Sequence, residues 1–217
     1  MKIAPLALIF LILSGCYSDG PDSELNVWRG ERTTDHGVVK WAVGSELTCV
    51  ATCLVDQLVI TSRRCAENTD VLFSGSADRA LTPIEVGLDL DQQNDLSLIQ
   101  IDEGICTSQY LPGPHTDAMK FLIVGYGLDG SDTAVDPNDT LGIRRVGEIP
   151  GNRISEYEAD DNYLIQYFDE EHGFPNHGDV GAPLLGVDAA GKIHIVGVFS
   201  RLIDGEFAAL YRKTYQR

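Results

Sequence analysis

The sequence predicts an all-β protein arranged in two halves of similar size. Short runs rich in valine, isoleucine, leucine and aromatic residues recur along its 217 residues, separated by glycine, aspartate and asparagine. This is the pattern of short strands joined by turns, and few windows show the apolar spacing of an amphipathic helix. The stretch LPGPHTD at 111–117 divides the runs into two groups, so a sandwich or a pair of barrels is expected. The runs are GVVKWAV, LVITS, DLSLIQI, KFLIVGYG, NYLIQYF and KIHIVGVFS.

The first element along the chain is a signal segment at residues 1–15. Lys2 precedes an apolar run at 3–13, which is too short to span a bilayer as a permanent helix. The run ends in LSGC at 13–16, which resembles the lipobox of bacterial lipoproteins, where the cysteine is acylated and becomes the N-terminus. The resemblance implies lipidation of Cys16, with palmitate among the acyl groups. The alternative is an ordinary signal peptide followed by a chance cysteine.

Lipidation would hold the chain on the bacterial cell envelope. Several acyl chains anchor a protein far more firmly than a single chain does. Tyr17, rather than an aspartate, follows the cysteine, and in such lipoproteins this implies export to the outer membrane. Residues 16–26 then comprise the acylated cysteine and a flexible tether.

The charge of the chain restricts its partners. With 33 acidic and 16 basic residues, the formal net charge is −17, which opposes recognition of nucleic acid or of an anionic membrane surface through charge. A solvated acidic surface is the simplest interpretation, and a cationic partner is the alternative. We expect an envelope or extracellular protein as the partner, no nucleic acid, and membrane contact through the lipid on Cys16.

Four cysteines follow the signal segment: Cys49, Cys53, Cys65 and Cys106. An even set in an exported protein favours disulfides, and the residues alone leave all three pairings open. The rival interpretation is a metal site, but the cysteine spacing fits no common zinc pattern. We therefore expect disulfides, no metal and no cofactor.

Three segments together resemble the catalytic blocks of the chymotrypsin/trypsin family of serine proteases, in the family's order. They are CVATCLVDQLVITSRRC at 49–65, NDLSLIQI at 94–101 and GDVGAPLL at 178–185, and they resemble the segments around the catalytic histidine, aspartate and serine. Weaker similarities are VWRG at 27–30, IVGYG at 123–127 and HIVGVFS at 194–200.

The resemblance extends over 27–215 and implies the fold of the family, two six-stranded antiparallel β-barrels. The N-terminal barrel is expected at about 27–110, a linker at about 111–119 and the C-terminal barrel at about 120–217, with the family's C-terminal helix reduced or absent. The same resemblance implies a disulfide between Cys49 and Cys65, which leaves Cys53 to pair with Cys106.

The catalytic positions that the resemblance implies are altered in two of three cases. Asp95 occupies the position of the carboxylate, but Arg64 occupies that of the histidine and Val180 that of the serine. An arginine does not deprotonate in proteins and so cannot act as a base, and valine has no heteroatom to attack a carbonyl group. Catalysis by a serine–histidine–aspartate triad is therefore not expected.

The surroundings of these positions match the family more closely. The resemblance places the two donors of the oxyanion hole, the backbone amides that bind the substrate carbonyl oxygen, at Gly178 and Val180. It places Asp179 where the family pairs an aspartate with a buried N-terminal amine. The old specificity pocket falls on Phe174, Ser200 and Arg201, with the Phe174 ring filling its base. Gly181 and Pro183 keep the turn that follows the nucleophile.

Arg64 and Asp95 suggest a structural role of their own. The family brings these two positions together, so a guanidinium–carboxylate pair is predicted to replace the lost histidine–aspartate hydrogen bond.

The leading hypothesis is an inactive trypsin-like domain, a pseudoprotease, that acts by protein binding or as a scaffold on the envelope. One alternative is an active peptidase or esterase with displaced residues such as Ser200 and His177. Another is a purely structural envelope lipoprotein, and a further one is an acidic inhibitor of a cationic enzyme.

Overall fold

The computed structural model describes somewhat more than half of the chain, in segments that contain most of the predicted strands. These are residues 31–32, 38–43, 46–55, 57–66, 71–73, 80–81, 83–86, 95–101, 109–116, 119–125, 145–169, 171–175, 177–203 and 207–215. Among them the helical segments are single turns: α1 (Arg63–Ala66) and the 3₁₀ turns η1 (Gly151–Arg153) and η2 (His177–Asp179). The prediction of an all-β fold is confirmed.

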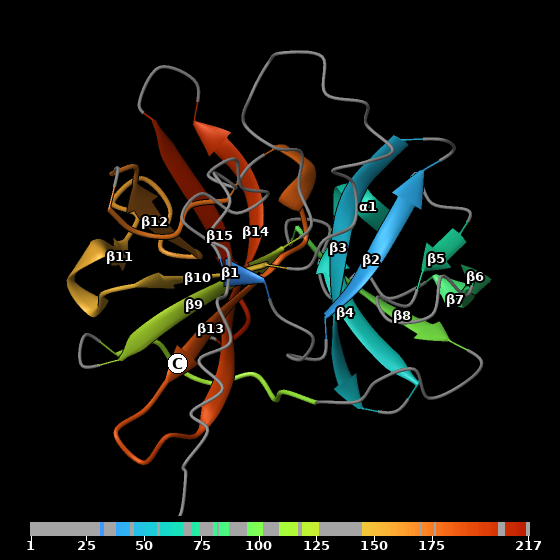
Figure 1. The fold of residues 1–217 in the computed structure, drawn as a ribbon, viewed down its shortest axis with the longest axis horizontal. Coiled ribbons are helices and arrows are strands. Elements are labelled where there is room, and N and C mark those ends of the chain that lie inside the picture. Colours follow the sequence, from blue (N-terminus) through green and yellow to red (C-terminus); the bar gives the residue numbers. More distant parts are fainter. Residues whose placement is uncertain are drawn as a thin grey trace, which may run out of the picture.

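The N-terminal half forms an antiparallel sheet of seven strands in the order β6-β5-β2-β3-β4-β8-β7. It curls at the right of Figure 1, in blue to green. Its strands are β2 (Val38–Val43), β3 (Glu46–Val55), β4 (Leu58–Ser62), β5 (Val71–Phe73), β6 (Ala80–Leu81), β7 (Pro83–Val86) and β8 (Leu96–Ile101).

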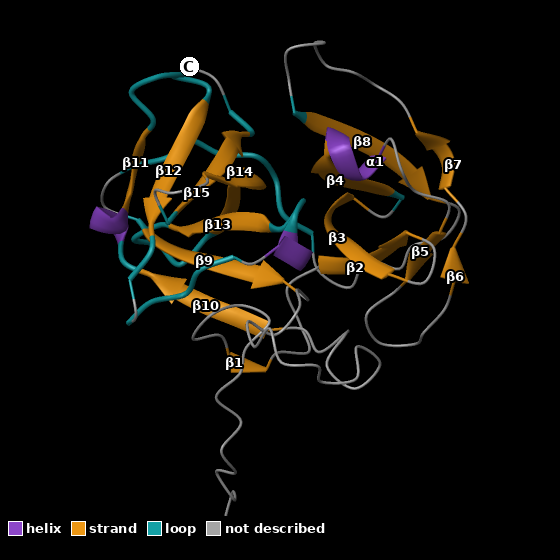
Figure 2. Cartoon of the chain, turned by 90° about the horizontal axis from the view of Figure 1, so that it is seen from above, coloured by secondary structure: helices purple, strands orange, loops and turns teal. Residues whose placement is uncertain are grey.

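The C-terminal half forms an antiparallel sheet of eight strands in the order β1-β10-β9-β13-β14-β15-β12-β11. Figure 2 shows this sheet beside the first one. Its strands are β1 (Glu31–Arg32), β9 (Lys120–Gly125), β10 (Arg145–Ile149), β11 (Ile154–Glu156), β12 (Tyr163–Tyr167), β13 (Pro183–Val187), β14 (Ile193–Ile203) and β15 (Ala208–Lys213).

The strand numbers correct one detail of the prediction, which gave six strands to each half. The described strands form sheets of seven and eight because β6 adds to an edge of the first sheet and β1 and β11 add to the two edges of the second, and these strands have only two or three residues each. β1 also lies in the expected N-terminal half by sequence but pairs with β10 of the C-terminal sheet, with Glu31 opposite Val146. Backbone pairing, rather than position along the chain, therefore assigns β1 to its sheet.

The largest hydrophobic core crosses the junction between the two sheets. Its fully buried side chains come mainly from the C-terminal sheet and include Phe121, Phe199 and Tyr211. Val50 and Ile60 of the N-terminal sheet belong to the same cluster. The two halves therefore share apolar contacts and are not merely joined by the linker.

The predicted linker is itself tied to both sheets. The amide of Tyr110 donates to the carbonyl of Cys53 in β3 at 3.1 Å, and the amide of Gly113 donates to the carbonyl of Ile195 in β14 at 3.0 Å. After β15, the described residues 214 and 215 are not helical. In the part of the chain that the structure describes, no helix is long and apolar enough to cross a membrane.

Candidate functional site

The three predicted catalytic blocks meet where the two sheets face each other. η2, which precedes Val180, lies as a short orange turn between β14 and β3 in Figure 1. The amide of Val50 in β3 donates to the carbonyl of Val180 at 2.7 Å. The hydroxyl of Ser62 at the end of β4 donates to the carboxylate of Asp95 at 3.2 Å. Segments that lie far apart in sequence therefore form one site.

The backbone around Val180 is held from several sides. Besides the bond from Val50, a sulfur atom of the bonded Cys65 lies 3.4 Å from the Val180 carbonyl oxygen. The next amide, that of Gly181, donates to the carbonyl of Phe199 at 2.8 Å, and the amide of Phe199 donates back to Ala182 at 2.8 Å. The side chain of Val180 is half-buried and packs against both the large core and the smaller core around the disulfide. The nucleophile position thus holds a fixed backbone and an apolar side chain.

Gly181 lies in close contact with two strands of the N-terminal sheet. Its φ is +88°, and a Cβ atom there would lie 2.1 Å from the carbonyl oxygen of Val50 and 2.3 Å from Oγ1 of Thr61. That hydroxyl in turn donates to the same Val50 carbonyl at 2.6 Å. Only glycine combines this backbone conformation with this lack of space.

The Asp95 carboxylate is held by two hydroxyl groups. Ser62 donates to its Oδ1 and Ser200 to its Oδ2, while the side chain of Arg64, on α1, is exposed. The expected Arg64–Asp95 pair is therefore not formed between these two described residues. The two serine hydroxyls stabilise the carboxylate by hydrogen bonding.

Ser62 was missed by the sequence interpretation, which attended to the residue types of the triad. The signal that would have found it is its place at the end of β4, two residues before the predicted position of the base.

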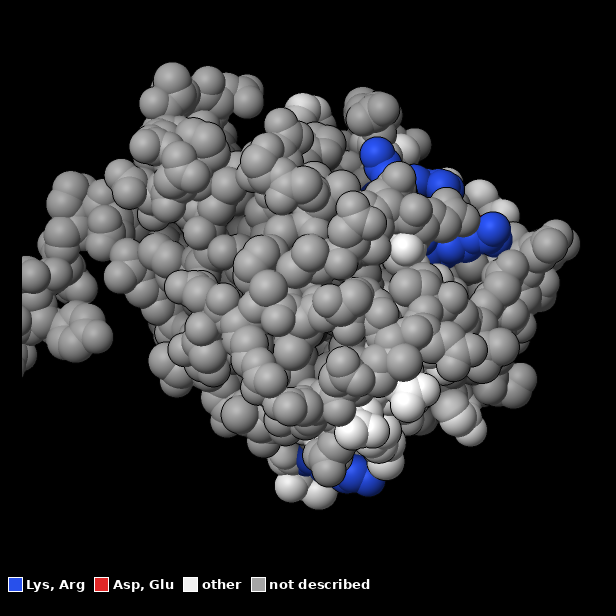
Figure 3. Space-filling model, turned by 90° about the vertical axis from the view of Figure 1, so that its right-hand side faces the viewer, with Lys and Arg blue, Asp and Glu red and all other residues white. Residues whose placement is uncertain are grey.

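Figure 3 looks onto the side of the molecule that the N-terminal sheet occupies. The described charged side chains visible there are basic, in contrast to the net acidity of the whole chain.

Two of the three residues assigned to the old specificity pocket, Phe174 and Ser200, are buried. Phe174 is buried and meets the Phe168 ring edge-on, with 5.2 Å between ring centres. Near the same core, the hydroxyl of the fully buried Tyr211 donates to Oε1 of Gln166 at 2.6 Å, and Nε2 of Gln166 donates to the carbonyl of Gly173 at 2.6 Å. Burial, and secondarily the nearby Asp179 carboxylate, raise the pKa of Tyr211 well above its usual range. The region around Phe174 is therefore filled by aromatic rings and by hydrogen bonds between buried groups.

The remaining assigned residues occupy the positions around η2. Gly178 and Asp179 are both buried, and Asp179 is fully so. The amine that the family would pair with Asp179 belongs to residues 27–30, which lie outside the described residues. Arg201 follows Ser200 on β14 and is exposed.

The predicted disulfide between Cys49 and Cys65 is confirmed, with 5.8 Å between the two Cα atoms. It ties the start of the first block to its end, next to Val180. Cys53 is also disulfide-bonded. Its expected partner Cys106, like the lipidation candidate Cys16, lies outside the described residues.

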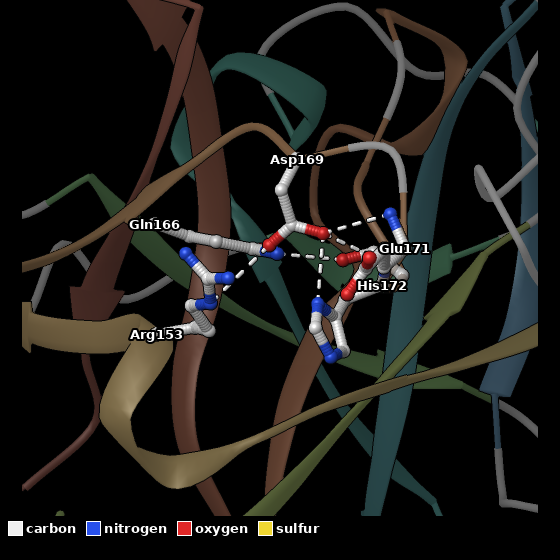
Figure 4. A network of polar contacts seen from close by, with 6 residues as sticks. Arg153, Gln166, Asp169, Glu171 and His172 are labelled. Atoms are coloured by element: carbon white, nitrogen blue, oxygen red, sulfur yellow. Dashed lines mark hydrogen bonds and ion pairs between the residues drawn. The ribbon is translucent and has the colours of Figure 1, made fainter.

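A contact between an aspartate and a histidine lies in the loop before Phe174 and has a structural role (Figure 4). Oδ1 of Asp169 accepts bonds from Nδ1 of His172 at 2.8 Å and from the amides of Glu171 and His172 at 2.9 Å each. Arg153 approaches Oδ2 at 3.4 Å. Burial pushes the pKa of Asp169 upward, but the bonds from Glu171 and His172 together hold it below its usual range. The ionised carboxylate therefore fixes the shape of the loop.

A cavity of about 690 Å³ lies away from these positions. It is bordered by residues 114–116, by Ser155 and Glu156 of β11, and by Lys213 and Tyr215 near the end of the described chain. None of the candidate site residues lines it. In the described part of the chain, no three histidine, cysteine, aspartate or glutamate side chains gather as metal ligands.

Comparison with known proteins identifies the fold. No protein-family model matches the chain, and no curated protein is similar in sequence. Among solved structures, the scabies mite inactivated protease paralogue S-D1 is similar, with a TM-score of 0.62 and 16% identity over 85% of this chain and 91% of that one. A Glu endopeptidase in complex with MPD is similar as well, with a TM-score of 0.60 and 14% identity over 85% of this chain and 90% of that one. The chain has the fold of the trypsin-like serine proteases.

Proposed function

We propose that this trypsin-like domain has no hydrolytic activity and acts by binding another protein, through the surface around its old catalytic cleft. The observation that carries the proposal is Val180. The sequence resemblance assigns the nucleophile position to Val180, and its side chain packs into two apolar clusters. No atom of that side chain can form a covalent intermediate.

The rest of the catalytic set supports the same conclusion. Arg64 is exposed and is a residue type that cannot accept a proton. Ser200 carries the hydroxyl considered as a substitute nucleophile. It is only 4% exposed and donates a hydrogen bond to the carboxylate of Asp95. A nucleophile needs a base beside it and access to the substrate, and a hydroxyl buried against a carboxylate lacks that access.

The oxyanion-hole positions offer a further argument. Gly178 lies within the 3₁₀ turn η2 (His177–Asp179). A 3₁₀ turn bonds each carbonyl to the amide three residues on, so a turn that starts at His177 is expected to use the amide of Val180. That amide would then point back into the turn and away from a substrate carbonyl.

The similar structures show why residues, and not fold, must decide this question. One of them is described as an inactivated protease paralogue and the other as an endopeptidase. The same fold therefore accommodates both outcomes. With Arg64 and Val180 at two of the three catalytic positions, the inactive state is the better supported for this chain.

We propose further that lipidation of Cys16 anchors the domain to the outer membrane of the bacterial cell envelope, on the strength of the LSGC sequence. The test is metabolic labelling with a palmitate analogue during expression with the signal segment intact. Label should enter the native chain and be absent from Cys16→Ser. Equal labelling of both chains, or of neither, would remove the anchor from the proposal.

The catalytic half of the proposal is tested with a fluorophosphonate probe and a broad pool of peptide substrates. The native chain is compared with the double variant Arg64→His and Val180→Ser. Silence of the native chain is the expected result, and labelling of it would overturn the proposal. Activity gained by the double variant would show that the cleft is open and that the two replaced side chains account for the loss.

The binding half is tested by crosslinking in intact cells. A defined partner should be captured by the native chain and lost on substitution of exposed residues beside the cleft, such as Arg64. Capture that survives these substitutions would favour the alternative, a structural lipoprotein that does not use the cleft.

A further inference from the structure

Two arginines from neighbouring strands lie against one tyrosine ring. The guanidinium carbon of Arg212 lies 5.2 Å from the centre of the Tyr163 ring, and that of Arg201 lies 5.9 Å from it. Both distances are within the usual range of cation–π contacts. Tyr163 on β12 pairs directly with Arg212 on β15, and Arg201 on β14 pairs with Leu210, two residues before Arg212. The three side chains therefore lie on the same face of adjacent strands.

The two arginines differ in their exposure to solvent. Arg212 is 4% exposed and Tyr163 is 8% exposed, whereas Arg201 is exposed. The Nε atom of Arg212 is buried without a hydrogen-bond partner. A buried polar group without a hydrogen bond is costly for a folded protein, so the Nε–H of Arg212 is a donor that an acceptor from a ligand would satisfy.

The acidic groups near the cluster are already engaged. Asp160, in the turn before β12, accepts bonds from the amide of Asn162 at 3.0 Å and from Nδ2 of the same residue at 2.8 Å. The hydrogen bond from the Asn162 amide has the largest effect in lowering the pKa of Asp160. The side-chain bond from Asn162 and the charges of the two arginines lower this pKa further. Asp95 is held by Ser62 and Ser200. Neither carboxylate lies within 4.0 Å of a nitrogen of Arg201 or Arg212, all four residues being described.

We infer that Tyr163, Arg201 and Arg212 form a binding site for a carboxylate group of an acidic peptide. The planar guanidinium binds a carboxylate through two parallel hydrogen bonds. Arg201 supplies an exposed guanidinium, and Arg212 supplies a second positive charge against the same ring. Ser200, which precedes Arg201, contacts Asp95, so the site adjoins the old catalytic position, and the inference rests on the binding function proposed above.

The net charge of −17 sets a condition on this recognition. At long range the chain repels an acidic peptide, so the affinity must come from short-range contacts. At an ionic strength of roughly 0.15 M, charges more than about 8 Å apart are largely screened. Binding is therefore measured under that condition.

The test measures binding of a fluorescein-labelled tetraglutamate peptide to the full chain in detergent, by fluorescence anisotropy. A tetraserine peptide serves as the uncharged control. Tetraglutamate should bind and tetraserine should not, and Arg201→Gln should weaken tetraglutamate binding about tenfold or more, as for a lost charge-assisted pair. The matched control is Arg153→Gln, which removes a half-exposed arginine in another loop and should leave the affinity unchanged.

Arg201 is chosen because its exposed side chain can be replaced without disturbing the core, whereas Arg212→Gln changes a buried group. Arg201→Lys keeps the charge but loses the planar fork, and it should give an intermediate affinity. The inference is overturned if tetraglutamate fails to bind, or if Arg201→Gln and Arg153→Gln bind it equally. The fluorophosphonate probe separates the two proposals. Labelling of the native chain refutes the inactive domain, whereas silence without tetraglutamate binding refutes only this site.

Discussion

Replacing Gly181 by alanine tests whether the seam between the two sheets is as close as the structure shows. The added Cβ would lie 2.1 Å from the Val50 carbonyl oxygen and 2.3 Å from Oγ1 of Thr61. The first of these is a backbone atom that cannot rotate away, so the segment carrying Val180 must shift. That shift would weaken the bonds from Val50 to Val180 and from Gly181 to Phe199, of 2.7 and 2.8 Å.

The magnitude follows from three contributions. The left-handed backbone costs alanine about 1 kcal/mol, overpacking costs about 1–3 kcal/mol, and each weakened bond about 0.5–1.5 kcal/mol. We expect Gly181→Ala to lower the free energy of unfolding by about 3–7 kcal/mol, the sum of these contributions with two weakened bonds. Urea denaturation followed by circular dichroism measures this quantity.

The chain provides a matched control in Gly191. Its φ is +78°, close to that of Gly181, but nothing lies within 4 Å of the Cβ position. Gly191→Ala should therefore cost only the backbone contribution of about 1 kcal/mol. If the two variants lose the same stability, the close approach between the sheets is wrong and only the backbone conformation matters.

Three further predictions concern the site and the loop beside it. Val180→Ser alone should lower stability by about 1–2 kcal/mol, because a hydroxyl replaces apolar packing, and should leave the fluorophosphonate probe unreactive; labelling of this single variant would contradict the need for a base. Ser200→Ala should cost about 1–3 kcal/mol in the same denaturation assay, because the Asp95 carboxylate loses one of its two hydroxyl donors; no change would mean that Ser62 suffices. The lowered pKa of Asp169 means that its ionised form stabilises the folded state above about pH 4 and that this contribution is lost as the pH falls through the folded pKa. Asp169→Asn should therefore be less stable than the native chain at pH 7, with a gap that closes toward low pH; a gap independent of pH would contradict the role of the charge.

The sequence was sufficient to predict the features that depend on local pattern. Short apolar runs separated by turn residues indicated strands, and the resemblance of the first block to the family placed the disulfide between Cys49 and Cys65 correctly. The position of Val180 beside the first block also follows from the resemblance, because a shared fold brings the same segments together.

The interactions that were missed depend on contacts between distant segments. The guanidinium–carboxylate pair between Arg64 and Asp95 was predicted because the family brings these two positions together. Proximity does not prevent another donor from binding the same carboxylate. Ser62, already on the neighbouring strand, reaches the carboxylate without burying a second charge. The Tyr163 cluster joins strands that are separated in sequence, so no local motif could have indicated it.

In the segment around Val180 and Gly181, the main chain and the side chain have different roles. The main chain around Val180 fastens the sheets to each other, whereas the side chain at that position projects from a framework that other atoms hold in place. The side chain at this position can therefore change while the main chain continues to hold the two sheets together. A domain built in this way keeps a well-formed surface for recognition whichever side chain stands there.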